Sequence, residues 1–427
     1  MPHELQVVGK AARTADERSR HSLCSVPPIG VRPPKPTPIV IAAYFGYVIV
    51  GWFLNGLGSV LPELENELGK RASAYTFLPG VVLLAWGSIV VRRHRGAAPA
   101  SPHTSTMVLG SAALAGGVLV MGITRWFGVS AIGAGISATA AAALIRLMPA
   151  MLASARPDDT ERVLIRANAY SSLAAIAAPL AVGLSILLGG GWLPGIVVPI
   201  GGGAVVIVLM TRGNRTGQPA AALQPAKPVH DDEPVVPPFA LWWREITVLT
   251  LCIVVEFCFS YFAATFLHEE VEMSTAGAAA GAAAWGCGMT IGRFITSTWP
   301  PPRSILVSVV LITFGFGLMW GIATPVSSIA GIGLAGLGAS PLYPTRMTAL
   351  LHRFPRSPDQ AATRGSIASG IALISAPVLM AGLRAATDVR SAYLAVPLLL
   401  AVLAILARPI PAPTLATEAS IQPALRD

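Results

Sequence analysis

Glu256 is the residue of this sequence whose setting most clearly demands a chemical explanation. It stands inside the apolar stretch CIVVEFCFS, residues 252–260, whereas the other 20 of the 21 acidic residues fall in tails, loops or the linker. A charged group in a lipid-soluble segment costs at least about 2.5 kcal/mol, so such residues are rare and usually functional. At helical spacing its neighbours on one face are small and weakly polar: Cys252, Ser260, Ala263 and Ala264. The pattern fits a carboxylate that binds a proton or a substrate in a water-filled cavity, or one that forms a structural pair with a neighbouring helix.

Asn55 occupies the position in the first apolar segment that Glu256 occupies in the seventh, when both are measured back from Ser73 and Ser274. It shares a helix face with Tyr44, Tyr47, Gly51, Trp52 and Ser59. Amide and aromatic groups that converge on a cavity can orient a polar solute, so Asn55, Tyr44 and Trp52 join Glu256 and Ser260 as candidate binding residues. Tyr44 and Tyr47 equally fit anchors near the membrane interface, and Asn55 fits a hydrogen bond between helices.

Arginines supply the second group of candidates. Arg146 and Arg346 lie inside apolar segments, near the ends that are expected to face the cytoplasm. Either could bind an anionic solute, or could pair with a helix C-terminus while its long side chain reaches the interface. Arg92, Arg93 and Arg293 are expected to be cytoplasmic gate or topology residues. The acidic stretch HEEVEMS, residues 268–274, is interpreted as a solvated loop.

The elements that must position these residues are membrane-spanning helices. The 427 residues are 53% hydrophobic and 12% charged, whereas soluble domains are about a quarter charged. A segment of roughly 17–25 apolar residues can cross a bilayer as a helix. Twelve such segments are present, at 39–61, 75–91, 105–124, 128–152, 169–190, 192–211, 246–267, 275–299, 304–323, 325–351, 365–383 and 391–409. The sequence therefore predicts an all-α integral membrane protein whose Ala- and Gly-rich helices pack closely on one another.

Polar segments divide the chain. The linker 212–240 is rich in proline and separates two six-helix halves, which cover 38–211 and 241–409. A basic N-terminal tail over 1–37 is expected to be disordered and to stay in the protein, because no apolar signal-peptide core precedes the first segment. A second Pro-rich tail covers 410–427.

The distribution of the basic residues explains the net charge of +9. With the N-terminus inside, the inner segments hold 23 Lys and Arg residues and the outer loops hold five: Lys70, Arg71, Arg125, Arg384 and Arg390. The positive-inside rule then places both termini in the cytoplasm of a multi-pass protein, expected in the plasma membrane. Because topology accounts for the basic excess, nucleic acid is not an expected partner.

The two halves repeat one another. Shifted by 198 residues, 131–179 aligns with 329–377 without a gap, and twelve of the 49 positions are identical. The matches include Gly133 with Gly331 and Pro179 with Pro377. Because six helices make up each half, both halves enter the membrane in the same direction, as parallel repeats of transporters do.

Several motifs carry a resemblance to one family. The stretches NGLGSVLPELENELG (55–69), MTIGRF (289–294) and SIAGIGLAGLGASPLYPT (328–345) resemble the first, eighth and tenth spans of major facilitator superfamily transporters. VVRRHRG (90–96) resembles the basic loop after the second span, without its usual Gly and Asp. The drug-antiporter branch is not indicated, since Ala178 and Val129 stand where that branch has Gly and Arg. The resemblance implies two six-helix bundles around a central cavity.

These observations predict secondary active transport of a small solute, driven by the proton gradient, by a monomer in a lipid bilayer. Neither enzymatic activity nor a cofactor is expected: GIGLAG (331–336) matches a dinucleotide motif in letters but lies in an apolar helix, and the four cysteines lack metal or redox spacing. Export of a drug or metabolite and import of a sugar-like nutrient both stay open. The alternative from another class is a non-transporting membrane sensor or assembly partner on the same fold.

Overall fold

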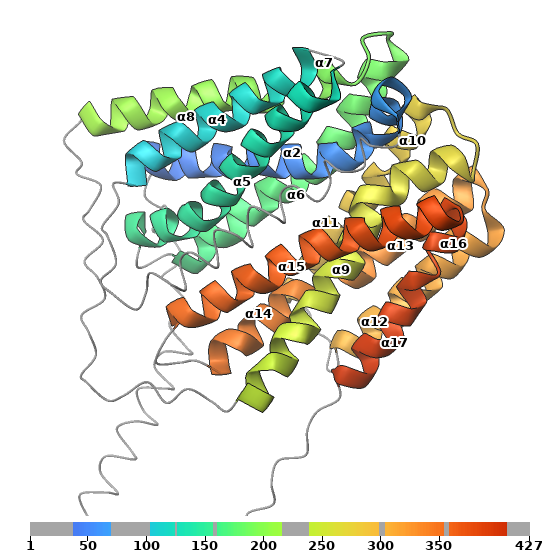
Figure 1. Cartoon of the computed structure of the whole chain (residues 1–427). Coiled ribbons are helices and arrows are strands. Elements are labelled where there is room, and N and C mark those ends of the chain that lie inside the picture. The colour runs from blue at the N-terminus through green and yellow to red at the C-terminus, as the bar shows by residue number, and fades with distance from the viewer. Residues whose placement is uncertain are drawn as a thin grey trace, which may run out of the picture. The chain divides into compact units, whose positions relative to one another are not determined.

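The computed structural model describes residues 37–69, 103–123, 126–156, 160–215, 239–298, 304–353 and 358–407. These residues form helices and short connections, with no strand among them, which confirms the predicted all-α class (Figure 1). The predicted second segment, 75–91, lies outside the described residues, as do both tails and most of the linker.

Six helices make up the described part of the first half. They are α2 (Pro38–Leu68), α4 (His103–Ile123), α5 (Phe127–Ala155), α6 (Thr160–Leu187), α7 (Leu193–Ile196) and α8 (Val198–Arg215). α2 continues beyond the predicted end at residue 61, so that Glu65 and Glu67 lie on its last turns and not in a loop.

The second half follows the same plan. Its elements are α9 (Phe239–Glu269), α10 (Thr275–Gly281), α11 (Ala283–Thr298), α12 (Ser304–Gly317), the π-helical turn η3 (Leu318–Ile322), α13 (Pro325–Ala339), α14 (Leu342–Arg353), α15 (Pro358–Ala386), α16 (Val389–Ala392) and α17 (Ala395–Leu406).

Ten helical segments of the described residues are long and apolar enough to cross a membrane, and they correspond to ten of the twelve predicted spans. The predicted span 275–299 is divided between α10 and α11 by a turn at Ala282, so neither piece is long enough alone. Other breaks coincide with prolines, because proline weakens a helix interior but suits a first turn. Pro199 and Pro397 thus lie in the first turns of α8 and α17, directly after the short helices α7 and α16.

The internal repeat is visible in the helices themselves. α6 and α15 begin 198 residues apart, at Thr160 and Pro358, and each carries its proline at the corresponding position, Pro179 or Pro377. Side-chain bonds repeat in the same register: Ser130 Oγ donates to the Met121 carbonyl at 2.9 Å, and Ser328 Oγ donates to the Met319 carbonyl at 3.2 Å.

Close helix crossings explain the glycines that the two halves share. A Cβ on Gly133 would lie 2.6 Å from the Gly117 carbonyl oxygen, where α5 crosses α4. Gly331 of the GIGLAG stretch meets Gly315 in the same way, where α13 crosses α12. The interpretation of that stretch as a packing motif is thus confirmed by its contacts.

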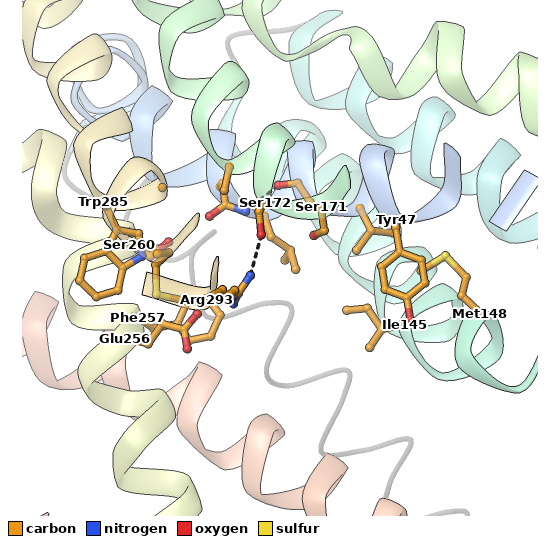
Figure 2. Close-up of a pocket in the computed structure, with 17 residues that line it drawn as sticks. Tyr47, Ile145, Met148, Ser171, Ser172, Glu256, Phe257, Ser260, Trp285 and Arg293 are labelled. Atoms are coloured by element: carbon orange, nitrogen blue, oxygen red, sulfur yellow. Dashed lines mark hydrogen bonds between the residues drawn. The ribbon is translucent and has the colours of Figure 1, made fainter. Parts of the chain in front are cut away.

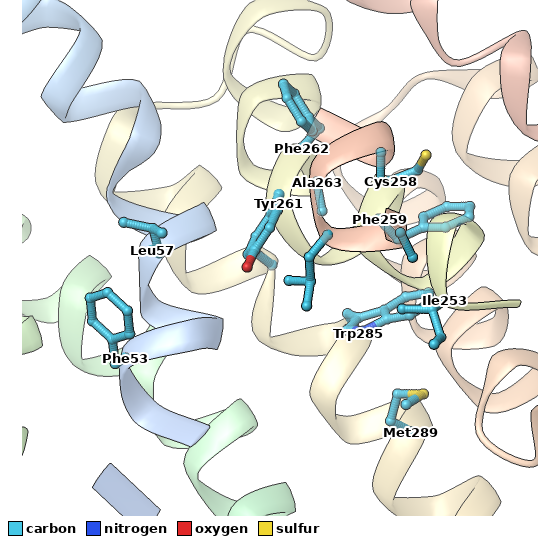
Figure 3. Packing of buried hydrophobic residues seen from close by; sticks show 14 of the residues in the cluster. Phe53, Leu57, Ile253, Cys258, Phe259, Tyr261, Phe262, Ala263, Trp285 and Met289 are labelled. Atoms are coloured by element: carbon cyan, nitrogen blue, oxygen red, sulfur yellow. The ribbon is translucent and has the colours of Figure 1, made fainter. Parts of the chain in front are cut away.

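Small residues also mark the crossings between the halves. α2 contacts α9, and α6 contacts α10 and α11. A Cβ on Gly58 of α2 would lie 2.8 Å from Tyr261 Cα of α9, and one on Gly286 of α11 would lie 2.6 Å from the Ala175 carbonyl oxygen of α6. Figure 3 shows Phe53 and Leu57 on α2 and Tyr261 on the side of α9 toward them, while Phe259 stacks on Trp285 with ring centroids 5.1 Å apart.

Candidate functional site

A cavity of about 190 Å³ lies between the two halves of the chain. The first half contributes residues of α2, α5 and α6, and the second contributes residues of α9 and α11. The polar and charged lining residues are Tyr47, Asn55, Ser171, Ser172, Glu256, Ser260, Trp285 and Arg293. Figure 2 shows Glu256, Phe257 and Arg293 on one side and Tyr47, Ile145 and Met148 on the other.

Glu256 and Arg293 are the two charged residues in this lining. Both side chains are half-buried, since each is covered by protein on one side and faces the cavity on the other. Arg293 Nη1 donates to Ser172 Oγ at 2.9 Å, which joins α11 of the second half to α6 of the first (Figure 2). Arg293 is predicted to be a cytoplasmic gate or topology residue, and in the structure it lines the cavity.

The cavity brings together some of the other candidates from the sequence. Asn55 and Ser260 line it, although the Asn55 amide nitrogen also donates to the Gly51 carbonyl at 2.8 Å within α2. Trp52 lies elsewhere, because its indole nitrogen donates to the Gly195 carbonyl of α7 at 2.9 Å. Tyr44 packs on Tyr170, with ring centroids 5.2 Å apart, in a separate cluster of the first half.

Of the remaining arginine candidates, the structure describes the side chain of Arg346. Arg346 Nη1 of α14 lies 3.9 Å from Glu245 Oε2 of α9, and Arg346 is not among the residues that line the cavity. Arg146 belongs to α5, but its side chain lies outside the described residues. Arg92 and Arg93 also lie outside them.

A cluster of three charged residues joins the halves at the end where α2, α9 and α15 finish. Arg384 is 6% exposed, and its Nη1 and Nη2 donate to Glu65 Oε1 and Oε2 at 2.8 and 2.6 Å. Its Nε donates to Glu269 Oε2 at 3.0 Å, and its Nη2 also contacts Glu269 Oε1. We call Arg384, Glu65 and Glu269 the charge clamp, because one guanidinium group holds carboxylates of both halves.

A second ion pair and a cation–π contact lie at the same end of the helices as the charge clamp. Arg390 Nη1 donates to Glu270 Oε1 at 2.6 Å, and the Arg390 guanidinium lies 4.8 Å from the centre of the Trp320 ring. The interpretation of HEEVEMS as a solvated loop is therefore wrong for Glu269 and Glu270, since both form ion pairs.

The prediction that Arg384 lies in an outer loop is wrong, since it lies on the last turn of α15 and is buried. The sequence contains only a weak indication of the clamp, namely an isolated arginine at the end of one helix and glutamates at the ends of two others. Glu65 and Arg384 of the clamp are 319 residues apart in the sequence, and no spacing rule connects them.

Comparison with known proteins agrees with this architecture. A family model described as Major Facilitator Superfamily matches residues 43–357. A search of curated proteins gives no significant match.

Solved transporter structures share the fold at low sequence identity. The nucleoside transporter NupG (D323A mutant) is 16% identical, with 86% of this chain and 97% of that chain covered and a TM-score of 0.64. A bacterial homologue of the human lysosomal transporter Spinster, in an inward-facing and occupied conformation, is 13% identical over 86% of this chain and 95% of that chain, with a TM-score of 0.60. A POT family transporter in complex with a thioalcohol-conjugated peptide is 11% identical over 91% and 96%, with a TM-score of 0.67. With a family model that spans most of its length and helices arranged as in these transporters, the chain belongs to the Major Facilitator Superfamily.

Proposed function

We propose that this protein is a secondary active transporter that moves a small solute across the plasma membrane by alternating access, with Glu256 as the coupling carboxylate. The observation that supports the proposal most directly is a carboxylate and a guanidinium group facing one cavity that both halves line. Transporters built from repeats bind substrate at the interface of the repeats and expose it to either side by rocking one half against the other.

The contacts between the halves identify the end that would open and close in such a movement. The charge clamp holds α2 against α9 and α15 at one end, and glycine crossings bring α2 and α6 close to α9 and α11. In the proposed cycle, the clamp separates when that end opens and re-forms when it closes. With both termini in the cytoplasm, the clamp end faces the outside.

Coupling would take place at Glu256. A proton or a cationic group of the solute can each neutralise this carboxylate, and a buried site disfavours leaving it charged and unpaired. Each species therefore displaces the other, which links solute movement to proton movement.

The test uses purified protein in liposomes that enclose a pH-sensitive dye. We expect that, within a panel of small solutes, at least one will move protons across the membrane and accumulate against its gradient in response to a pH difference. Glu256→Gln retains the shape and a hydrogen-bonding group but cannot ionise. It should abolish gradient-driven accumulation while exchange at saturating solute persists. Glu272→Gln is the matched control, because Glu272 is an exposed carboxylate of the α9–α10 connection.

Three outcomes contradict parts of the proposal. Accumulation by Glu256→Gln at the level of the parent protein shows that this carboxylate is not the coupling site. If Glu256→Gln lowers the melting temperature while the surviving protein stays coupled, the residue is a structural partner. Solutes that raise the melting temperature of the parent protein but never cross the membrane indicate a sensor on the same fold.

A further inference from the structure

The two charges of the cavity face the same space without pairing with each other. Among the described residues, no ion pair within 4.0 Å joins Glu256 to Arg293, and no hydrogen bond of the Glu256 carboxylate is found. A guanidinium group has five N–H donors, and the structure shows one hydrogen bond from Arg293, to Ser172 Oγ. Both groups therefore retain capacity for a ligand.

Charge balance restricts what that ligand can be. Glu256 and Arg293 are the charged residues in the described lining, which therefore has one negative and one positive group. A cation would leave the guanidinium without a counter-charge, and an anion would leave the carboxylate without one. An unpaired charge is costly in a site removed from bulk water. A ligand with one ammonium and one carboxylate group satisfies both and adds no net charge.

The rest of the lining indicates the body of the ligand. Phe257 is a half-buried aromatic residue of the lining, whereas Trp285, Met148 and Met289 are buried. The aromatic surface of Phe257 packs well on apolar groups. The volume of about 190 Å³ is below the roughly 300–1,000 Å³ of drug-sized pockets. The site thus suits a compact molecule.

We propose that the substrate is a small zwitterion of amino-acid size with an apolar or aromatic side chain. Its ammonium group binds the Glu256 carboxylate, its carboxylate binds the Arg293 guanidinium, and its side chain packs on Phe257. This inference rests on the proposed transport function and names the class of solute for it. It also specifies how solute and proton movement are coupled, because the ammonium group of the solute and the proton compete for the Glu256 carboxylate.

The first experiment needs no variant of the protein. Binding of L-phenylalanine to the purified parent protein is compared with that of its methyl ester, a cation, and of N-acetyl-L-phenylalanine, an anion. L-Leucine and its two matching derivatives test an aliphatic side chain. Because each derivative leaves one charge of the cavity without its partner, we expect affinity to fall by about tenfold or more for each.

Two variants then assign the ends of the ligand. Glu256→Gln should lower the affinity for the amino acid, and this variant should bind the amino acid and its N-acetyl derivative with similar affinity. Arg293→Gln should lower the affinity for the amino acid, and this variant should bind the amino acid and its methyl ester with similar affinity. Arg293→Lys keeps the positive charge and should retain more of the discrimination than Arg293→Gln. Glu272→Gln should match the parent protein in every assay.

The outcomes separate this inference from the proposed function. Failure of the parent protein to bind either amino acid, or equal binding of the ester or N-acetyl derivative, overturns the zwitterion inference. If another solute is then transported in a Glu256-dependent way, the transport proposal stands without it. If the amino acids bind with the expected charge pattern but do not cross the liposome membrane, recognition is correct and transport is wrong.

Discussion

Arg384 shows at the scale of single residues how charge is handled where the two halves meet. It is almost fully buried, yet both of its carboxylate partners accept charge-assisted hydrogen bonds from it, and Glu65 does so in bidentate geometry. Such a pair is hard to remove one partner at a time, because the remaining charge is left buried and uncompensated.

We therefore expect Arg384→Ala to lower the free energy of unfolding by up to about 3–5 kcal/mol, a loss reduced because Glu269 is 34% exposed. The measurement is the thermal melting of the detergent-purified protein. Adding Glu65→Gln and Glu269→Gln to this variant should recover part of the loss, since it removes the unpaired carboxylates. Arg166→Ala, at an exposed arginine of α6, is the control and should change stability by no more than about 0.5 kcal/mol. No recovery in the triple variant would show that charge imbalance is not the cause.

The candidate site was only partly accessible to sequence reasoning at this scale. Glu256 could be identified because a carboxylate within a long apolar run is conspicuous from local sequence alone. Trp52 was expected on the same face as Asn55, but a helix face does not tell which neighbouring helix it meets, and Trp52 meets α7. The clamp depends on three helix ends brought together by the fold, which no local pattern encodes.

At the scale of elements, apolar length predicted most helices but not their ends. Charged residues end an apolar run without ending a helix, and so α2 continues through three glutamates to Leu68. Breaks inside apolar runs, such as that at Ala282, are set by packing and by backbone geometry that hydropathy does not register. The repeat register, in contrast, was readable from sequence because glycine and proline mark backbone positions directly.

The crossing of α2 and α9 gives the prediction at this scale. Gly58→Ala would place a methyl group against the backbone of Ser260 and Tyr261, which cannot move aside as a side chain can. We expect a loss of about 1–3 kcal/mol in the free energy of unfolding, from overpacking.

Gly116→Ala is the matched control for that change. A Cβ on Gly116 of α4 meets nothing within 4 Å, so this variant should be neutral or slightly stabilising. Equal melting temperatures for the two variants would mean that the α2–α9 crossing is looser in the membrane than in this structure.

At the scale of the whole molecule, the described contacts between the halves include the clamp at one end and the cavity farther along the helices. If the clamp holds that end closed, weakening it should expose the cavity there. In a cysteine-free background, Ser260→Cys should react slowly with an impermeant thiol reagent added outside cells, and several-fold faster when Arg384→Ala is also present. An unchanged rate would show that the clamp does not control access to Ser260.

The orientation is tested by the same chemistry. A cysteine at position 230, in the predicted cytoplasmic linker, should react only after the membrane is made permeable. A cysteine in place of the exposed Glu272 should react in intact cells. The opposite pattern would reverse the topology and place the clamp on the cytoplasmic side.

The carboxylates around the clamp have an electrical consequence. Among the described residues, seven acidic side chains gather at these helix ends against two arginines: Glu63, Glu65, Glu67, Glu269, Glu270, Glu272 and Asp388, with Arg384 and Arg390. The C-terminal ends of α2, α9 and α15 add their negative dipole ends to the same region. Among the described residues, this end therefore has more negative than positive groups, a balance that attracts cations and protons from solution. Salt at 0.1 M screens such a field within about 10 Å. The rate at which protons and positively charged groups arrive at this end should therefore fall as ionic strength rises, even where the affinity of the cavity does not change.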